Sequence, residues 1–275
     1  MTNDIKISII TPSYNQGDYI EKTILSVLNQ TYQNIEYIII DGGSTDNTLE
    51  IINKYRDRID IVISEKDKGQ SDAINKGFRL ASGVLSGWIN SDDILYSHCV
   101  EELVATYKKS PDTAIFFSPY LDFINESGDY LQTKYNPITG KKYLLYKNYD
   151  LNQQASFYNN RLLKEINYLD ESIYFCMDLD LWLKLLDHGD IFPISNKSQG
   201  AFRIWGNTKT STGTLDFLTE IRNTLQKNGL RSWDKLILKT YYQAFRFRVS
   251  RFVKKNFRTL FSYISPPNTS RKNNK

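Results

Sequence analysis

Two adjacent carboxylates, Asp92 and Asp93, follow the apolar segment from Val84 to Ile89. That segment predicts a buried strand, so the pair lies where the strand ends and the chain turns. Neighbouring carboxylates repel each other, and a protein that fixes two of them usually holds a cation or a sugar hydroxyl there. The alternative is a polar turn that caps the helix expected near His98. The pair alone does not decide between a binding site and a turn.

A third carboxylate, Asp178, belongs to a helix predicted for residues 176–188. At about 100° per residue, Asp180 and Lys184 share one side of this helix, which we expect to face solvent. Asp178 falls on the opposite, largely apolar side. It is either a cap at the helix start or a general base that the positive end of the helix keeps ionised.

The elements that must position these carboxylates alternate strictly over the first ninety residues. Such an order predicts an open, parallel, doubly wound α/β sheet, in which ligands bind beyond the carboxyl ends of the strands. One of these ends is Asp41, which closes an all-isoleucine strand and is therefore expected to face the crevice. The predicted strands cover residues 5–10, 36–40, 59–63 and 84–89, with helices after the first turn, up to about residue 55 and over residues 71–81.

Composition narrows the class of protein. The chain has 275 residues, 40% hydrophobic and 24% charged, as expected for a soluble globular protein with a full core. Its two cysteines, Cys99 and Cys176, and its two histidines do not form a zinc pattern, and we expect reduced, cytoplasmic thiols. We expect neither a secretion signal nor a membrane-spanning helix. The dinucleotide-binding G-x-G-x-x-G pattern and the P-loop are also absent from the sequence, which excludes the usual dehydrogenases and P-loop enzymes.

The carboxyl terminus is strongly basic. Residues 231–275 contain 12 Lys/Arg and one acid, a net charge of +11, whereas the rest of the chain has 23 basic and 30 acidic residues, a net charge of −7. Aromatic and basic residues recur at three- and four-residue steps from 236 to 264, which predicts an amphipathic helix lying on an anionic membrane surface. A helix packed on its own domain is the alternative. Nucleic acid is not expected as a partner, because the body of the protein is acidic.

Five motifs in order resemble the family 2 glycosyltransferases, which have the GT-A fold. The resemblance covers about residues 5–210 and implies transfer of a sugar from a nucleotide diphosphate donor to a hydroxyl, with inversion at the anomeric carbon. It also implies a divalent cation, Mg²⁺ or Mn²⁺, on the diphosphate. The motifs are Ser8-Ile-Ile-Thr-Pro-Ser-Tyr-Asn, Ile40-Asp-Gly-Gly-Ser-Thr-Asp-Asn-Thr, Lys68-Gly-Gln-Ser-Asp-Ala-Ile-Asn-Lys-Gly, Asn90-Ser-Asp-Asp and Met177-Asp-Leu-Asp-Leu-Trp-Leu.

The same resemblance implies roles for individual residues. Asp178 is the expected base and Asp93 the expected metal ligand, while Asp92 is expected to meet the ribose or the donor sugar. Asp67 and Asp72 lie in the segment expected to close over the donor, although both are also compatible with simple turn and cap roles. The residues expected to bind the donor are Thr11, Pro12, Ser13, Tyr14, Asp41, Asp67, Gly69, Asp72, Asn75 and Asp92.

Two positions depart from the family pattern. Met177 stands where an acid often precedes the base, and Trp205 stands where the family often has a histidine near the diphosphate or metal. Trp205 is predicted either to stack on a sugar of the acceptor or to pack in the core.

The expected organisation is a catalytic domain at residues 1–212, a helical extension at 213–264 and a disordered tail at 265–275. The expected activity is sugar transfer from a UDP- or dTDP-type donor to a glycan or lipid-linked acceptor in surface polysaccharide biosynthesis, at the inner face of the cell membrane. The alternatives are a sugar-nucleotide pyrophosphorylase, for which residues 12–17 are a poor match to the required Gly- and Arg-rich loop, and a non-catalytic protein that binds carbohydrate or membrane.

Overall fold

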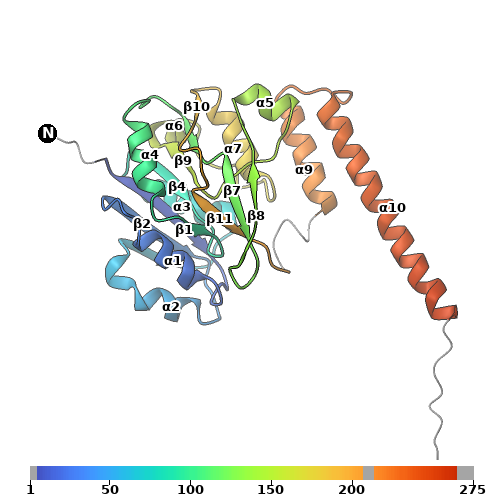
Figure 1. The fold of residues 1–275 in the computed structure, drawn as a ribbon, viewed down its shortest axis with the longest axis horizontal. Helices are drawn as coiled ribbons and strands as arrows, with labels where there is room; N and C mark the ends of the chain where they lie inside the picture. The colour runs from blue at the N-terminus through green and yellow to red at the C-terminus, as the bar shows by residue number, and fades with distance from the viewer. Residues whose placement is uncertain (1–4, 207–213, 265–275) are drawn as a thin grey trace, which may run out of the picture.

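The computed structural model describes residues 5–206 and 214–264. Its first part alternates strands and helices as the sequence predicts (Figure 1). The elements are β1 (Ile7–Ser13), α1 (Ile20–Leu28), β2 (Ile35–Asp41), α2 (Thr48–Lys54), the 3₁₀ turn Arg56–Arg58, β3 (Ile61–Ser64), α3 (Gln70–Leu80) and β4 (Leu85–Trp88).

The remaining elements are shorter and less regular in order. They are β5 (Ile94–Leu95), α4 (Cys99–Tyr107), β6 (Ile115–Phe117), β7 (Tyr120–Ile124), β8 (Tyr130–Tyr135), α5 (Lys141–Tyr146), β9 (Ser156–Asn159), α6 (Asn160–Glu165), α7 (Met177–Leu185), β10 (Ile191–Pro193), β11 (Gly200–Arg203), α9 (Thr214–Lys227) and α10 (Lys235–Ile264).

The central sheet has the strand order β10-β6-β9-β4-β1-β2-β3. β1 pairs in parallel with both β2 and β4, and β2 pairs in parallel with β3, so their carboxyl ends share one edge. β9 is antiparallel to β4 and to β6. The expected doubly wound, mostly parallel sheet is therefore confirmed, with one reversed strand inserted beside β4.

Alternate residues of the strands face opposite layers, as the two-residue period of a strand requires. In β2, Ile38 and Ile40 pack among residues of α3 and α7, whereas Tyr37 and Ile39 pack among residues of α1, α2 and α4. Because both faces are covered by helices, the isoleucine-rich strands are buried on both sides.

A second, four-stranded sheet has the order β5-β11-β7-β8. β7 and β8 form the hairpin that the sequence predicts around residues 125–128. β11 joins β7 in parallel and β5 in antiparallel fashion, which brings residues 200–203 next to the segment after β4. This sheet forms one wall of the site described below.

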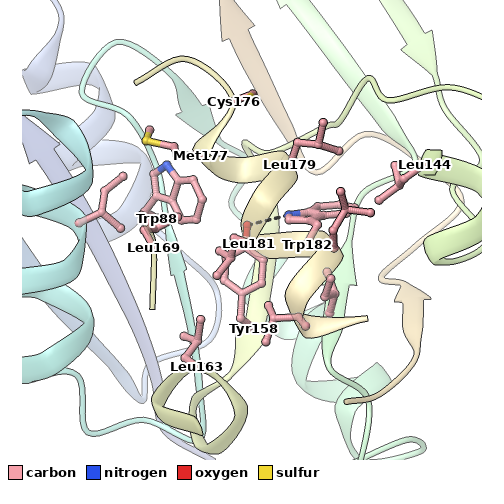
Figure 2. Close-up of a cluster of buried hydrophobic side chains, with 14 of the residues drawn as sticks. Trp88, Leu144, Tyr158, Leu163, Leu169, Cys176, Met177, Leu179, Leu181 and Trp182 are labelled. Atoms are coloured by element: carbon pink, nitrogen blue, oxygen red, sulfur yellow. Dashed lines mark hydrogen bonds between the residues drawn. The ribbon is translucent and has the colours of Figure 1, made fainter. Parts of the chain in front are cut away.

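Helix α7 is anchored by a dense apolar cluster (Figure 2). Trp182 is fully buried and donates its indole N–H to the Tyr158 hydroxyl over 3.1 Å. Leu179 and Leu181 of the same helix are also buried, and Trp88 of β4 lies in the same cluster. The helix that carries Asp178 is thereby fixed against the central sheet.

The C-terminal helices divide into a buried and an exposed part. Ile221, Leu225 and Ile237 belong to the same apolar cluster as α7, so α9 and the start of α10 extend the core. The rest of α10 extends away from the body (Figure 1). Its exposed apolar side chains are Leu238, Tyr241, Tyr242, Phe245, Val249, Phe252 and Val253.

The predicted domain boundary at residues 212–213 and the predicted tail at 265–275 lie outside the described residues. Among the described residues, none of the helices has the length and hydropathy of a membrane-spanning segment. Cys99 and Cys176 are both buried and free.

Candidate functional site

A cleft of about 750 Å³ lies where the ends of several elements meet. Its walls include the carboxyl end of β1, the amino end of α3, the segment after β4 and the first turn of α7. Trp205, just after β11, and Phe123 of β7 close it from the second sheet. This is the crevice expected of an open parallel sheet.

Six residues predicted to bind the donor line this cleft. Ser13 stands out because its hydroxyl oxygen is buried and has no hydrogen-bond partner within the described ranges. A buried hydroxyl without a partner is costly, so a polar ligand atom would stabilise it. The six lining residues are Pro12, Ser13, Tyr14, Asp67, Gly69 and Asp92.

The start of α3 is shaped by Asp67 and Gly69. The Asp67 carboxylate accepts the Gly69 backbone N–H over 2.9 Å. Gly69 immediately precedes the helix at φ +122°, a conformation that residues with a side chain rarely adopt. The turn therefore needs glycine, and Gly69 and Gln70 line the cleft at the start of α3.

Asp92 and Asp93 point in different directions. Asp92 is half-buried and lines the cleft, whereas Asp93 is fully buried behind it. The Asp93 carboxylate accepts three hydrogen bonds, from the Arg203 backbone N–H at 3.0 Å, the Asn90 amide at 3.1 Å and the Gln154 amide at 3.2 Å. Asp93, the predicted metal ligand, thus holds the turn together, and Asp92 is the carboxylate that faces the cleft.

Burial destabilises the charge on both acids. It raises the pKa of Asp92, and the indole of Trp205 and the guanidinium of Arg203 only partly offset this. Burial, with repulsion from Asp92, raises the pKa of Asp93 well above its usual value. A cation close to these two carboxylates would stabilise their negative charge.

The predictions missed the residues that hold this acidic turn. Arg203 is almost fully buried and donates its Nε to the Asp92 carbonyl over 2.8 Å. Gln153, next to Gln154, donates its side-chain amide to the Trp88 carbonyl over 2.8 Å. The consecutive glutamines before the strand were one sequence signal for this support, since glutamine side chains are uncommon in a core.

Trp205 combines two contacts. Its indole N–H donates to the Asp92 carboxylate over 2.8 Å, and its ring lies 5.0 Å from that of Tyr19 between centroids. Tyr19 in turn donates its hydroxyl to Glu126 over 2.9 Å, and burial, with this contact, raises the pKa of Tyr19 to about 12. Trp205 is half-buried and lines the cleft, so it is not a fully buried core residue.

Asp178 lines the same cleft from the first turn of α7. It is half-buried, and it accepts the backbone N–H of Leu179 over 2.8 Å. The residue that precedes the helix is Cys176, which makes no side-chain cap. Asp178 therefore belongs to the first turn of the helix and lies beside the cleft. This agrees with its predicted place on the apolar side of the helix.

The prediction for Asp180 was wrong. Asp180 is only 1% exposed rather than solvated. Helix α9 covers this side of α7, and the Asp180 carboxylate lies 2.5 Å from the Lys184 ammonium and 3.8 Å from that of Lys227. Lys227 belongs to α9, and a helical projection of α7 alone does not include this second helix.

Four predicted donor residues do not line the cleft. Thr11 is buried and bonds to the Tyr37 hydroxyl over 3.0 Å. Asp72 accepts the Lys68 backbone N–H over 3.0 Å and pairs with Lys76 at 3.4 Å, a cap role. The other two are Asp41 and Asn75.

The side chains of Asp41 and Asn75 both form hydrogen bonds inside the protein. Asp41 accepts from the backbone N–H groups of Gly43 and Ser44 and from the Ser44 and Ser64 hydroxyls, so it fixes the loop after β2. Asn75 exchanges hydrogen bonds with the backbone of Leu169, both at 3.0 Å, on the far side of α3. Each supports the site from behind rather than facing the cleft.

No group of three or more His, Cys, Asp or Glu that could bind a metal occurs among residues 5–206 and 214–264. Mg²⁺ in substrate complexes is commonly bound by one or two carboxylates together with phosphate oxygens. Asp92, with its disfavoured charge, fits that more limited arrangement.

The family model described as "Glycosyl transferase family 2" matches residues 8–167. The chain belongs to this family. Among curated relatives, it is 29% identical to chondroitin synthase of Escherichia coli over 235 residues, 82% of this chain and 34% of that one. It is 31% identical to the glycosyltransferase GlyG of Streptococcus pneumoniae over 140 residues, 50% of this chain and 45% of that one. The match thus spans less than half the length of either relative.

Solved structures agree on the fold. TarS 1-349 of S. aureus in complex with UDP-GlcNAc superposes with a TM-score of 0.66 at 19% identity, covering 88% of this chain and 73% of that one. The mannosyltransferase PcManGT of Pyrobaculum calidifontis, in complex with GDP-Man and Mn²⁺, gives a TM-score of 0.64 at 13% identity, covering 87% and 70%. The chain therefore shares the GT-A fold with these structures.

Proposed function

We propose that this protein is an inverting glycosyltransferase. It transfers a sugar from a nucleotide diphosphate donor of the UDP or dTDP type, bound with Mg²⁺ or Mn²⁺, to a hydroxyl of a glycan or lipid-linked acceptor in surface polysaccharide synthesis. Family membership supports glycosyl transfer, and the similarity to chondroitin synthase supports a polysaccharide product. The nucleotide sugars in the TarS and PcManGT complexes support the donor class.

One observation carries the proposal. Asp92 and Asp178 are 86 residues apart in the sequence, yet both line one cleft beyond the carboxyl ends of the parallel strands. A leaving group that gains negative charge and an attacking hydroxyl that loses a proton need two separate groups on two sides of the reacting carbon. The two carboxylates meet these needs from different walls.

In this mechanism Asp178 accepts the proton of the acceptor hydroxyl as its oxygen attacks the anomeric carbon. The bond to the diphosphate oxygen breaks, and the nucleotide diphosphate leaves with the bonding electrons. Asp92, which lines the cleft, would hold the divalent cation rather than the buried Asp93. When bound, the cation supplies charge stabilisation on the diphosphate oxygens. No covalent intermediate with the protein is needed, because a single displacement inverts the configuration.

The donor is expected on the side of the cleft formed by Pro12, Ser13 and Asp67. The unpartnered Ser13 hydroxyl offers a hydrogen bond to the nucleotide. The acceptor is expected beside Phe123, Tyr149 and Phe175, which also line the cleft. Aromatic faces bind the apolar faces of sugar rings, so this side suits a glycan chain.

A thermal-shift panel of nucleotide diphosphate sugars, each with and without Mn²⁺, tests this proposal. A correct donor stabilises the folded protein by mass action, and the stabilisation should require the cation. The donor that passes is then incubated with candidate acceptors, and the anomeric configuration of the product is read by NMR. A panel in which no nucleotide sugar shifts the melting temperature would contradict the proposal.

We also propose that α10 rests on the inner, anionic face of the cell membrane, which would make the enzyme a peripheral, cytoplasmic protein. The exposed side chains of this helix combine aromatic residues with cations. Phe245 is 64% exposed and Phe252 69% exposed, and Arg246, Arg248 and Arg251 lie between them. Aromatic side chains enter the interface, and each basic residue near anionic lipid adds roughly 1 kcal/mol.

The test is sedimentation with anionic liposomes. Replacing Phe245 and Phe252 by Ser should reduce the bound fraction severalfold, because both side chains are exposed and their loss leaves the core intact. Tyr130→Ser is the matched control, since Tyr130 is 62% exposed on the β7–β8 hairpin. Equal binding by the double variant and the control would remove the membrane proposal.

A further inference from the structure

The carboxylate of Glu220, on α9, sits at the amino end of α7. It accepts three backbone N–H groups: Tyr174 at 3.0 Å, Phe175 at 2.6 Å and Cys176 at 3.3 Å. Cys176 directly precedes the first residue of α7. One side chain therefore binds the whole segment that leads into the helix of Asp178.

Glu220 is part of a continuous stripe on α9. Phe217 packs edge-on against Phe175 with 6.2 Å between ring centroids. The Thr224 hydroxyl and the Cys176 thiol are 3.3 Å apart, and the Lys227 ammonium reaches Asp180 at 3.8 Å. Residues three or four apart share one face of a helix, so this face of α9 matches the first turns of α7 and the segment before them.

The electrostatic surroundings agree with this geometry. The pKa of the Cys176 thiol is raised to about 12, chiefly by burial, although its contact with Thr224 opposes the rise. Repulsion from Asp178, Glu220 and Asp180 adds to it. Three carboxylates therefore surround the amino end of α7, and the helix dipole and its N–H groups stabilise negative charge there.

The first N–H groups of a helix need partners, and α7 has no side-chain cap of its own at Cys176. Glu220 instead supplies the acceptor for the backbone N–H groups of residues 174–176, which lead directly into the helix. The restraint acts two residues before Asp178. A general base works only when it is held within hydrogen-bond reach of the proton that it takes.

We propose that Glu220 is a positioning residue that fixes the first turn of α7 and so aims the Asp178 carboxylate at the acceptor hydroxyl. This role rests on the proposed function, in which Asp178 is the base. It also gives α9, which lies beyond the residues matched by the family model, a part in the chemistry.

The test compares Glu220→Ala and Glu220→Gln with the wild type in steady-state transfer. Loss of the acceptor should let the first turn of α7 move, and a shift of about 1 Å costs up to ~10²-fold in rate. We expect Glu220→Ala to lower kcat at least about tenfold with the donor KM within about twofold. Glu220→Gln keeps an acceptor oxygen at the same reach and should recover most of the kcat.

Glu36→Ala is the matched control. Glu36 also accepts three hydrogen bonds, from Ser8 Oγ, Ser82 N and Ser82 Oγ, but it lies at the opposite end of the sheet. The Glu36→Ala substitution should lower the melting temperature without changing kcat. If Glu220→Ala behaves like this control, with a lower melting temperature and unchanged kcat, the positioning role is overturned.

If Glu220→Ala does not fold, Glu220→Asp and Glu220→Gln provide a second comparison. Glu220→Asp is shorter by one methylene and should be slow, whereas Glu220→Gln should be fast; wild-type kcat in both would overturn the proposal. The proposed function is tested separately. Full turnover of Asp178→Asn would contradict the assignment of Asp178 as the base. Slow turnover of Asp178→Asn, together with full activity of the Glu220 variants, would contradict only the positioning role of Glu220.

Discussion

The two ends of the central sheet both hold carboxylates, but in different electrostatic states. At the amino end, burial of Glu36 is outweighed by hydrogen bonds from Ser8 and Ser82, so its pKa is lowered. At the carboxyl end, burial dominates, and the pKa values of Asp92 and Asp93 are raised. The same fold stabilises a negative charge at one end and disfavours it at the other.

This difference separates a structural carboxylate from a functional one. The hydrogen bonds of Glu36 tie β1, β2 and the segment before β4 together, and its charge has partners within the protein. Asp92 faces a cleft with a charge that the protein does not fully compensate. Titratable groups perturbed by burial inside a cleft are typical of sites that bind or react. The comparison predicts that changes at the carboxyl end alter chemistry and changes at the amino end alter stability.

The largest effect is expected at Asp178. Asp178→Asn should slow transfer at least about 10²-fold, because a positioned general base typically contributes ~10²–10⁴ in rate. Donor binding in the thermal-shift assay should be retained. Asp187→Asn is the control, since Asp187 is mostly exposed and pairs with Lys141 at 2.6 Å, away from the cleft. A normal transfer rate in Asp178→Asn would show that another group takes the proton.

Asp92 and Asp93 offer the next test. Asp92→Asn should abolish the cation-dependent part of the donor-induced thermal shift, with little change in the melting temperature of the free protein. Asp93→Asn replaces one of the two acceptor oxygens by an N–H₂ group and should lower the melting temperature by several degrees, because at least one of the three buried donors then loses its acceptor. The folded fraction should keep a cation-dependent shift. The reverse pattern would return the metal assignment to Asp93.

Trp205→Phe is expected to have a smaller effect, which acts through the Asp92 carboxylate. Phenylalanine keeps an aromatic ring near Tyr19 but lacks the N–H that holds Asp92. Without this restraint, the Mn²⁺ concentration needed for half-maximal donor binding should rise roughly three- to tenfold, the equivalent of about 1 kcal/mol. Tighter Mn²⁺ binding in the variant would instead mean that the indole competes with the cation for Asp92.

Much of the fold was predictable because each early segment carries its own signal. The isoleucine-rich strands and the helices between them follow local periods, and the parallel order follows from their alternation. The reversed strand β9 and the second sheet were not predictable in the same way. Their pairing depends on contacts such as Gly200 with Leu95, more than a hundred residues apart.

The site was predicted in part, for related physical reasons. The motifs identified Asp92 and Asp178, but adjacent residues in an extended chain point to opposite sides, and the sequence did not say which acid faces the cleft. Asp180 was misplaced because Lys227 and its helix cover that side of α7. Glu220 went unnoticed since nothing near it in the sequence marks a partner 44 to 46 residues away.

The smallest effect is expected at the amino end of the sheet, in the pH dependence of stability. The folded-state pKa of Glu36 is lowered from its usual 4.5, so its contribution is fully present above that value and is lost as pH falls through the folded-state pKa. Glu36→Gln should therefore be less stable than the wild type at neutral pH. The difference in unfolding free energy should shrink below about pH 4.5. Urea denaturation of both proteins between neutral and acid pH measures this difference.

Transfer kinetics of the same variant complete the comparison. At neutral pH and below its melting temperature, Glu36→Gln should turn over at the wild-type rate, because the residue contacts only the amino ends of the strands and the segment before β4. A loss of kcat without loss of stability would mean that the two ends of the sheet are coupled. The separation between a stabilising and a reactive end would then not hold for this protein.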